Sequence, residues 1–253
     1  MRVDGRERDA LREIRITPNY LRFAEGSALV EWGKNKIICA ATVEQRVPGY
    51  LIGSGQGWVT AEYSMLPRSA KQRIQRDGSR SGPNSRGIEI QRLIGRSLRA
   101  IVNLKAFGER TIMIDCDVVE SDGGTRTASI TGAFVALALA IERLREEKQI
   151  GQGAVILKDY MAAVSVGIVE GLPVLDLNYI EDSCAETDMN VVMTGKGRMV
   201  EIQGTAEKDP FTEEQFQAML RLAKKGSGEI AAIQKAVLGL ELGATPEASP
   251  VRG

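Results

Sequence analysis

Residues 120–140 read ESDGGTRTASITGAFVALALA. An acidic, polar step leads into the pair Gly123-Gly124 and then into a run of small and apolar residues. This run predicts a helix that is apolar around most of its circumference. Such a helix belongs in the interior of the protein, with neighbouring elements packed around it.

The start of this helix carries a chemical signal as well. Glycines in front of a helix let a ligand approach the backbone closely, and the first helical amides have no partner within the helix. Those amides and the helix dipole favour an anion, and the guanidinium of Arg126 suits phosphate oxygens. The plain alternative is a glycine turn followed by a surface arginine, and the spacing alone favours that alternative.

The segments before the quoted stretch predict more regular structure. Residues 13–45 read as strands, with a hairpin signalled by Gly33 and the two residues after it. Residues 86–105 have helical spacing of apolar residues, with Asn84 or Ser85 as candidate caps. Residues 110–119 alternate as a strand.

The segments after it repeat the theme of strands followed by a helix. We expect one hairpin around Glu170-Gly171 and another at residues 195–197. Thr212 and Gln215 form a capping-box pattern that opens a helix, and KKGSGE at residues 224–229 predicts an interruption before a second helical piece. The sequence thus predicts an α+β protein with two similar halves, about 1–150 and 151–240, and a loose tail at 241–253.

Composition narrows the class of protein. The chain has 253 residues, of which 43% are hydrophobic and 26% charged, as in ordinary soluble proteins. No apolar run approaches the roughly 20 residues that span a bilayer, and the charged N-terminus lacks the apolar core of a secretory signal. The three cysteines, Cys39, Cys116 and Cys184, are widely spaced, which predicts reduced core or half-buried thiols in a cytoplasmic protein.

Histidine is absent from the chain. This excludes Ser-His-Asp and Cys-His nucleophiles, histidine-ligated metals and the usual general base near neutral pH. Any chemistry must use carboxylates, arginine or lysine, backbone amides or a metal bound by oxygen.

Positive charge is concentrated in one region. Residues 68–110 carry a net charge of +8, and the rest of the neutral chain carries −8. Residues 68–85 predict an exposed loop that could bind a phosphate backbone through charge without reading its sequence. The sequence supports equally well the alternative that this is a solvated charged loop without a ligand. The basic residues of this loop are Arg68, Lys71, Arg73, Arg76 and Arg80.

Negative charge gathers in residues 178–190, NYIEDSCAETDMN, where we expect a turn before a strand. Carboxylates grouped in this way can hold Mg²⁺ or Mn²⁺, which prefer hard oxygen ligands. A solvated acidic turn is the commoner outcome. Arg86, at the start of the helix at 86–105, could complete a phosphate clamp with Arg126, or it could be one more solvated arginine. The four carboxylates are Glu181, Asp182, Glu186 and Asp188.

Five long blocks, taken in order, resemble the ribonuclease PH family of phosphorolytic 3′→5′ exoribonucleases. The resemblance runs from MRVDGRERDALR at the N-terminus to about residue 240, which is nearly the whole chain. The blocks are GSGQGWVTAEYSMLPR at 53–68, RGIEIQRLIGRSLRA at 86–100, GERTIMIDCDVVESDGGTRTASITGAFVALALA at 108–140, LDLNYIEDSCAETDMNVVMTGKG at 175–197 and VEIQGTAE at 200–207.

This resemblance implies a fold and an activity. The fold is the α/β arrangement of ribosomal protein S5 domain 2, with two halves in one domain over residues 1–240. The subunits form a homohexameric ring, a trimer of dimers. The activity is phosphate-dependent trimming of the 3′ end of tRNA precursors, which releases nucleoside 5′-diphosphates and can run in reverse. Inorganic phosphate is the co-substrate and Mg²⁺ or Mn²⁺ the metal; no membrane or DNA partner is expected.

The resemblance also implies roles for individual residues. It assigns phosphate binding to Arg86 and to Gly124, Thr125 and Arg126. It assigns metal binding and catalysis to Asp182 and Asp188, without saying which acts as acid or base. It assigns contacts with tRNA to Arg68, Arg73 and Arg76. The residue before Arg86 is Ser85, where the family pattern leads us to expect glycine.

Two other functions remain open from the sequence. A non-catalytic RNA-binding subunit of an exosome-like ring would have lost Arg86, Arg126, Asp182 or Asp188, yet all four are present. A small-molecule phosphotransferase would leave the basic segment unexplained.

Overall fold

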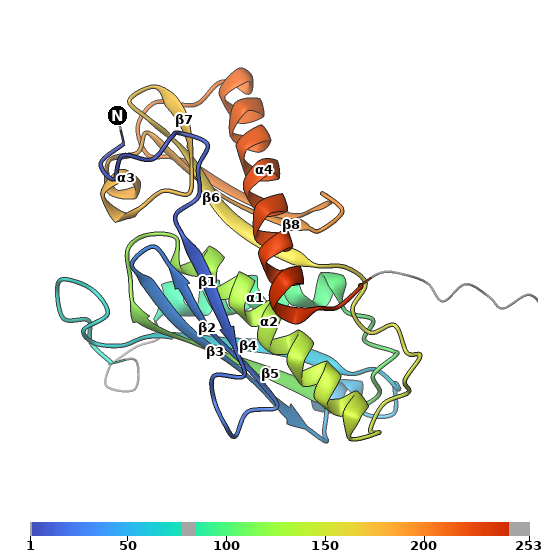
Figure 1. Cartoon of the computed structure of the whole chain (residues 1–253). Helices are drawn as coiled ribbons and strands as arrows, with labels where there is room; N and C mark the ends of the chain where they lie inside the picture. Colours follow the sequence, from blue (N-terminus) through green and yellow to red (C-terminus); the bar gives the residue numbers. More distant parts are fainter. Residues whose placement is uncertain (1, 77–83, 243–253) are drawn as a thin grey trace, which may run out of the picture.

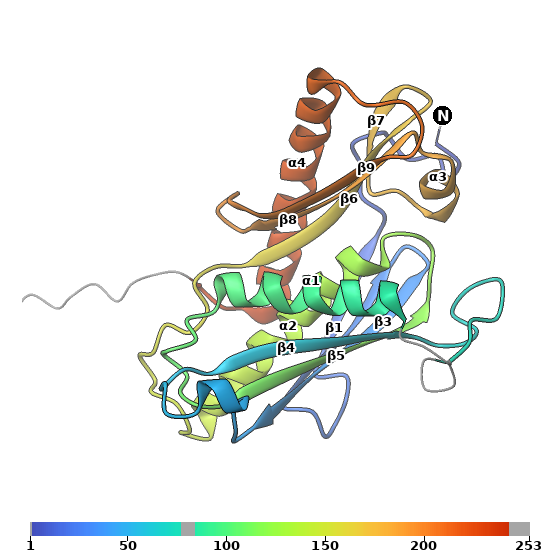
Figure 2. The same ribbon diagram turned by 180° about the vertical axis from the view of Figure 1, so that it is seen from behind.

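The computed structural model describes residues 2–76 and 84–242, so residues 243–253 of the expected tail lie outside the described part. Two sheets face one another, and two helices lie between them (Figures 1 and 2). The first sheet belongs to the N-terminal half of the chain and the second to the C-terminal half. The mixed α/β class expected from the sequence is confirmed.

The first sheet has five strands in the order β1-β2-β3-β5-β4. Its strands are antiparallel, except that β4 runs parallel to β5. As predicted, β5 turns one face inward, and Ile112, Ile114, Cys116 and Val118 are all at most 1% exposed. The strands are β1 (Ile14–Pro18), β2 (Gly26–Trp32), β3 (Asn35–Glu44), β4 (Trp58–Met65) and β5 (Thr111–Glu120).

The second sheet has four strands in the order β7-β6-β8-β9, and all of its pairs are antiparallel. Both hairpins expected here are confirmed, one turning at Glu170-Gly171 and one after Thr194. The halves therefore share a sheet followed by a long helix, but only the first contains a parallel pair. The strands are β6 (Met161–Val169), β7 (Leu172–Leu175), β8 (Thr187–Thr194) and β9 (Met199–Ala206).

Helix α2 (Thr125–Glu146) is the buried helix predicted from the opening stretch. It packs on β2 and β3 on one side and on β6 on the other. By length and composition α2 could cross a bilayer, contrary to the expectation that no segment has this character, but 83% of its apolar window is buried inside the protein. Glycine allows its close approach to the first sheet, since a Cβ on Gly132 would lie 2.5 Å from Cγ2 of Val30.

Helix α1 (Ser85–Ile101) lies beside α2 and covers β4. Asn84 is its N-cap, because the Asn84 side chain accepts a hydrogen bond from the Gly87 amide at 3.2 Å. Ser85 is then the first helical residue, so its difference from the family pattern leaves the helix start intact. The two remaining helices are α3 (Tyr179–Cys184) and α4 (Glu213–Leu238), and a short 3-10 helix, η1, spans Gly49–Leu51.

Helix α4 corrects one expectation. It begins with the predicted capping box of Thr212 and Gln215 but continues without interruption through residues 224–229. Gly226 is buried there, and a Cβ on it would lie 2.8 Å from Cδ1 of Leu175. The glycine therefore allows α4 to pack closely on β7, and the packing offsets its low helix propensity. Cys184 also departs from expectation, because it is exposed while Cys39 and Cys116 are buried.

The two glycines of α4 provide a test of this explanation. Gly228 is exposed with nothing near its missing Cβ, so Gly228→Ala should stabilise the protein by up to about 1 kcal/mol. Gly226→Ala gains the same propensity but overfills the contact with Leu175, so it should be less stable than Gly228→Ala by about 1–3 kcal/mol. Thermal unfolding of the two variants measures the difference, and equal Tm values would contradict a packing role for Gly226.

Candidate active site

The Gly123-Gly124 turn lies where the two halves meet. Both glycines have left-handed φ angles, 74° and 71°. A Cβ on Gly123 would lie 2.7 Å from the backbone of Asn178 and Tyr179, at the start of α3, so only glycine fits. Gly124 is the N-cap of α2, and no side chain among the described residues caps it. The first amides of α2 are therefore available to an anion.

Two side chains hold the carbonyl side of this turn. Arg12 donates from Nη1 to the Asp122 carbonyl at 2.6 Å and from Nη2 to the Gly123 carbonyl at 3.3 Å. Asn35 donates from Nδ2 to the Gly123 carbonyl at 2.6 Å, and its Oδ1 accepts from the Asp122 amide, also at 2.6 Å. The turn is therefore positioned by residues from the first forty of the chain.

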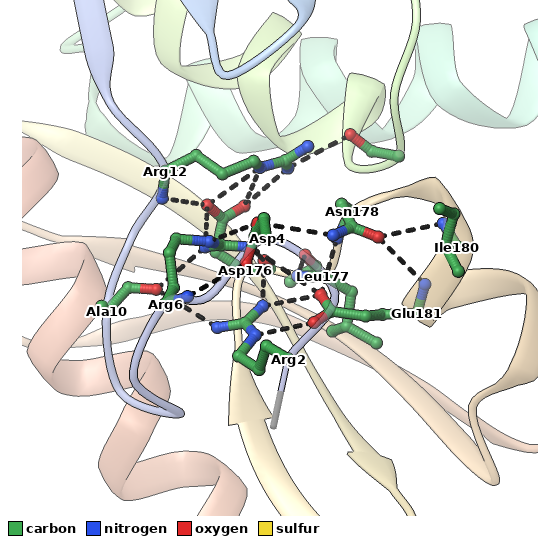
Figure 3. A network of polar contacts seen from close by, with 12 residues as sticks. Arg2, Asp4, Arg6, Ala10, Arg12, Asp176, Leu177, Asn178, Ile180 and Glu181 are labelled. Atoms are coloured by element: carbon green, nitrogen blue, oxygen red, sulfur yellow. Dashed lines mark hydrogen bonds and ion pairs between the residues drawn. The ribbon is translucent and has the colours of Figure 1, made fainter.

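The same arginine holds the other half of the protein through Asp176 (Figure 3). Arg12 Nη2 lies 2.6 Å from Oδ1 of Asp176, and the Arg12 amide and Trp32 Nε1 donate to Oδ2 at 2.7 and 2.9 Å. Asp176 is 1% exposed and has a left-handed φ of 56°. Burial acts to raise its pKa, but the charge and hydrogen bonds of Arg12 outweigh burial and keep the pKa below its usual value.

Asp176 leads directly into α3, which carries its own cap. The Asn178 side chain accepts from the Glu181 amide, and Glu181 Oε2 accepts from the Asn178 amide at 3.1 Å. Arg2 donates to both carboxylate oxygens of Glu181, each at 2.7 Å. These bonds hold the pKa of Glu181 below its usual value against the effect of burial. The N-terminal segment thus fixes the helix that carries Asp182.

The acidic stretch at 178–190 is accordingly not the turn that the sequence predicted. Its first part is α3, and Glu181 is engaged by Arg2 rather than free for a metal. Glu186 Oε1 accepts from the Gly171 amide at 3.0 Å, so this carboxylate holds the β6–β7 hairpin. Only Asp182 and Asp188 of the four remain as candidates for chemistry.

A cavity of about 370 Å³ opens beside the glycine turn. It lies between the N-terminal ends of α1, α2 and α3. Of the predicted site residues, Arg86, Gly124, Thr125 and Asp182 line it together, although they come from separate parts of the chain. The other lining residues are Tyr63, Met65, Ala70, Ile74, Asn84, Gly87, Ser121, Gly123 and Tyr179.

Tyr63 is a cavity residue that sequence reasoning missed. It is 4% exposed, and its hydroxyl lies 2.9 Å from Thr125 Oγ1. Burial raises the pKa of Tyr63, partly offset by its hydrogen bond with Thr125 and by the charge of Arg86, so the hydroxyl stays protonated at neutral pH. The pair fixes the side chain of the first residue of α2.

Asp182 on α3 and Asp188 on β8 are near enough for their charges to interact. Although Asp182 keeps contact with solvent, loss of surrounding water raises its pKa, and Arg86 and Arg126 partly oppose that rise. The pKa of Asp188 is raised first by burial and then by repulsion from Asp182. Two neighbouring carboxyls with raised pKa values are typical of acid–base or metal-binding sites.

Arg126 stands apart from the other predicted phosphate ligands. It is near enough to lower the pKa of both aspartates, but it is not among the residues that line the cavity. Its Nη1 instead donates to Glu89 Oε1 at 3.1 Å and to Gln203 Oε1 at 2.6 Å. Sequence reasoning gave no sign of either partner.

The described part of the basic loop, residues 68–76, begins at the rim of the cavity and extends away from the body of the protein (Figure 1). Ser121, next to the glycine turn, donates to the Ser69 carbonyl from both its amide and its hydroxyl, at 2.8 and 3.0 Å. Arg68, Arg73 and Arg76 are exposed, as predicted. Arg80 lies outside the described residues.

Several positioning residues carried little signal in the sequence. Arg12 is one of many charges in a charged N-terminal segment, and Asn35 looked like a plain turn residue. Asp176 could have been noticed, because a single carboxylate inside the apolar run VLDLN is expected to be buried and paired.

The chain matches known protein families along most of its length. Residues 10–141 match the sequence model of the 3′ exoribonuclease family, domain 1, and residues 159–226 match that of domain 2. Ribonuclease PH from Bacillus cereus (strain G9842) is 55% identical over 240 residues, which cover 94% of this chain and 97% of the relative. Ribonuclease PH from Listeria welshimeri is also 55% identical over 240 residues.

The chain belongs to the ribonuclease PH family. The resemblance read from the sequence is therefore confirmed. The ribonuclease PH fold is also seen in solved structures of lower identity. Rice (Oryza sativa) Rrp46 has a TM-score of 0.75 at 19% identity and covers 94% of this chain and all of its own. The Archaeoglobus fulgidus exosome with RNA bound to the active site has a TM-score of 0.75 at 21% identity, with 91% of each chain covered.

The raised pKa of Asp188, caused by burial and by repulsion from Asp182, leads to a prediction about the stability of this ribonuclease PH family member. Because the pKa of Asp188 is raised in the folded state, its ionisation costs stability as pH rises from its ordinary value of about 3.8 through the raised value. Asp188→Asn removes that cost, so the variant should be more stable than the wild type at pH 7 and should lose this advantage below about pH 3.8.

Chemical denaturation across pH 3–8 measures this difference. Glu186→Gln removes a charge from the same stretch but weakens the bond to the Gly171 amide, so it should not stabilise the protein. A neutral or destabilising effect of Asp188→Asn at pH 7 would contradict the raised pKa of Asp188.

Proposed function

We propose that the cavity beside the glycine turn is the phosphorolytic site of this chain. As a member of the ribonuclease PH family, the chain is a phosphate-dependent 3′→5′ exoribonuclease that processes the 3′ ends of tRNA. The observation that supports this location is that one cavity gathers Arg86, the open start of α2 at Gly124 and Thr125, and the carboxylate of Asp182. Cations and amides for an anion thus lie beside a carboxylate for proton or metal chemistry.

Inorganic phosphate takes the place between Arg86 and the first amides of α2, and Arg126 joins it as a further donor. An oxygen of this phosphate forms a bond to the phosphorus of the last phosphodiester of the RNA. The bond from that phosphorus to the 3′ oxygen of the preceding ribose breaks, and this oxygen gains a proton. The products are a nucleoside 5′-diphosphate and an RNA shortened by one nucleotide, and excess diphosphate reverses the reaction.

This scheme needs no activated side-chain nucleophile, which suits a chain without histidine. The guanidinium groups and amides stabilise the charge that develops on the transferred phosphorus. Asp182 or Asp188 can hold the proton, because their raised pKa values bring protonation closer to neutral pH. Either carboxyl can fill this role.

The two aspartates also fit a divalent cation. Mg²⁺ is commonly bound by one or two carboxylates together with substrate phosphates, so a pair suffices. No cluster of three or more potential metal ligands occurs in residues 2–76 and 84–242, which favours Mg²⁺ or Mn²⁺ bound with substrate over a site made by protein alone. A cation at Asp182 and Asp188 would neutralise charge on the reacting phosphate oxygens. It would also relieve the repulsion between the two aspartates.

The exposed arginines of the basic loop, Arg68, Arg73 and Arg76, hold the body of the tRNA precursor by its backbone. The loop starts at the cavity rim, so an RNA whose 3′ end enters the cavity passes close to it. We place the whole activity in one domain over residues 1–240, in a cytoplasmic enzyme that assembles as a homohexameric ring. A non-catalytic ring subunit is not favoured, because the relatives at 55% identity are named ribonuclease PH.

Incubation of the purified protein with a short single-stranded RNA and Mg²⁺ tests the proposal. Nucleoside diphosphates should appear only when inorganic phosphate is added. Arg86→Ala should slow their release by about 10²–10³, by analogy with the loss of one donor from an oxyanion site. Arg221→Ala, at an exposed position on α4, is the matched control. Monophosphates released without phosphate would show hydrolysis and contradict the mechanism.

A second experiment tests the basic loop. Replacing Arg68, Arg73 and Arg76 together by alanine should weaken binding of a tRNA precursor and reduce its salt dependence, because fewer counterions are released. Phosphorolysis of a short oligonucleotide should change little, since a short RNA reaches only the part of the loop at the cavity rim. Binding titrations at several salt concentrations measure how steeply the affinity for the tRNA precursor falls with salt. An equal loss of activity on the short oligonucleotide and on the tRNA precursor would contradict a role of these arginines in holding long RNA.

A further inference from the structure

The partners of Arg126 form a closed group of three side chains. Arg126 is on α2, Glu89 on α1 and Gln203 on β9. Arg126 Nη1 donates to Glu89 Oε1 and to Gln203 Oε1, and Gln203 Nε2 donates to the same Glu89 oxygen at 2.8 Å. The group thus joins the two helices between the sheets to the second sheet (Figure 2).

Glu89 occupies the kind of position that a phosphate oxygen would take. Its carboxylate oxygen lies on a guanidinium nitrogen, while Nε and Nη2 of Arg126 contact no partner within the described residues. The Arg126 side chain is 15% exposed and that of Glu89 is 42% exposed. Because solvent reaches Glu89, its ion pair with the less exposed Arg126 is partly screened, and a ligand can replace Glu89 at small cost.

The charges around the cavity explain how Glu89 can affect the binding of an anion to Arg126. Arg86 and Arg126 both lower the pKa of the two aspartates, so two cations share one neighbourhood. Without an anion between them they would repel one another. Glu89 adds a further negative charge directly on Arg126, besides those of Asp182 and Asp188, and this charge competes with phosphate for Arg126 and repels the phosphate.

We propose that Glu89 is the residue that sets the affinity of this site for inorganic phosphate. It holds Arg126 away from the cavity through Gln203 until phosphate, which carries more negative charge than a carboxylate, displaces it. Removal of the Glu89 charge should therefore tighten phosphate binding. This inference rests on the proposed function, because it concerns the phosphate of the phosphorolytic reaction.

Glu89→Gln tests the inference with little change of shape. Isothermal titration with inorganic phosphate should show a Kd lower by about two- to fivefold, the range expected for loss of one partly exposed ion pair. In the RNA assay the KM for phosphate should fall by a similar factor, and the main effect should be on KM rather than on kcat.

Glu201→Gln is the matched control. Glu201 also lies on β9 and pairs with an arginine of α1, since Arg96 donates to its two oxygens at 2.7 and 2.6 Å. The control removes the same charge from the same interface without touching Arg126. It should leave both the Kd and the KM unchanged.

The outcomes separate the two proposals. A Kd that is unchanged or higher in Glu89→Gln would overturn the inference, as would an equal decrease in Glu201→Gln, which would indicate a general effect of charge. A wild-type protein that binds phosphate but releases no nucleoside diphosphates would overturn the proposed function instead. The titration needs no turnover, so the role of Glu89 is decided in either case.

Discussion

The buried ion pair between Arg12 and Asp176 is the contact on which the rest of the site depends. One guanidinium binds the carbonyls of the glycine turn and, at 2.6 Å, the carboxylate that leads into α3. The start of α2 and the start of α3 are thereby held in one orientation, although the two segments are about fifty residues apart. Removal of Asp176 would leave the buried Arg12 without its carboxylate, and removal of Arg12 would leave Asp176 with the longer ion pair to Arg6 at 3.3 Å, so either change should cost more than loss of a surface contact.

The site built on this pair keeps opposing charges close together. Guanidiniums and helix amides attract an anion, while Asp182, Asp188 and Glu89 are carboxylates in the same neighbourhood. Phosphorolysis requires both kinds of group, because the attacking phosphate must be bound and the departing oxygen must gain a proton or a cation. The raised pKa values of the aspartates reflect the cost of this arrangement in the folded protein without substrate.

The division of the acidic stretch shows how local sequence and folded structure differ. Four carboxylates within eight residues look equivalent in the sequence, yet Glu181 pairs with Arg2 and Glu186 holds a hairpin, while Asp182 lines the cavity and Asp188 is near enough for its charge to interact with that of Asp182. The contacts of these carboxylates depend on residues that are distant in the sequence, such as Arg2 for Glu181. Helix α4 is a second example of a distant partner deciding local structure. It continues through Gly226 because Leu175 packs closely on that glycine.

Local periodicity, composition and ordered motifs were enough to predict the class of fold, the buried helix after Gly123-Gly124, the exposed arginines of residues 68–76 and the family. Family resemblance, rather than spacing, also named four of the residues that line the cavity, namely Arg86, Gly124, Thr125 and Asp182. The folded structure was needed to show that Arg12 and Asp176 join the two halves, that Tyr63 supports Thr125, and that Arg126 is held by Glu89 and Gln203. Contacts between segments distant in the chain depend on how strands and helices pack, and one sequence contains no local signal for them.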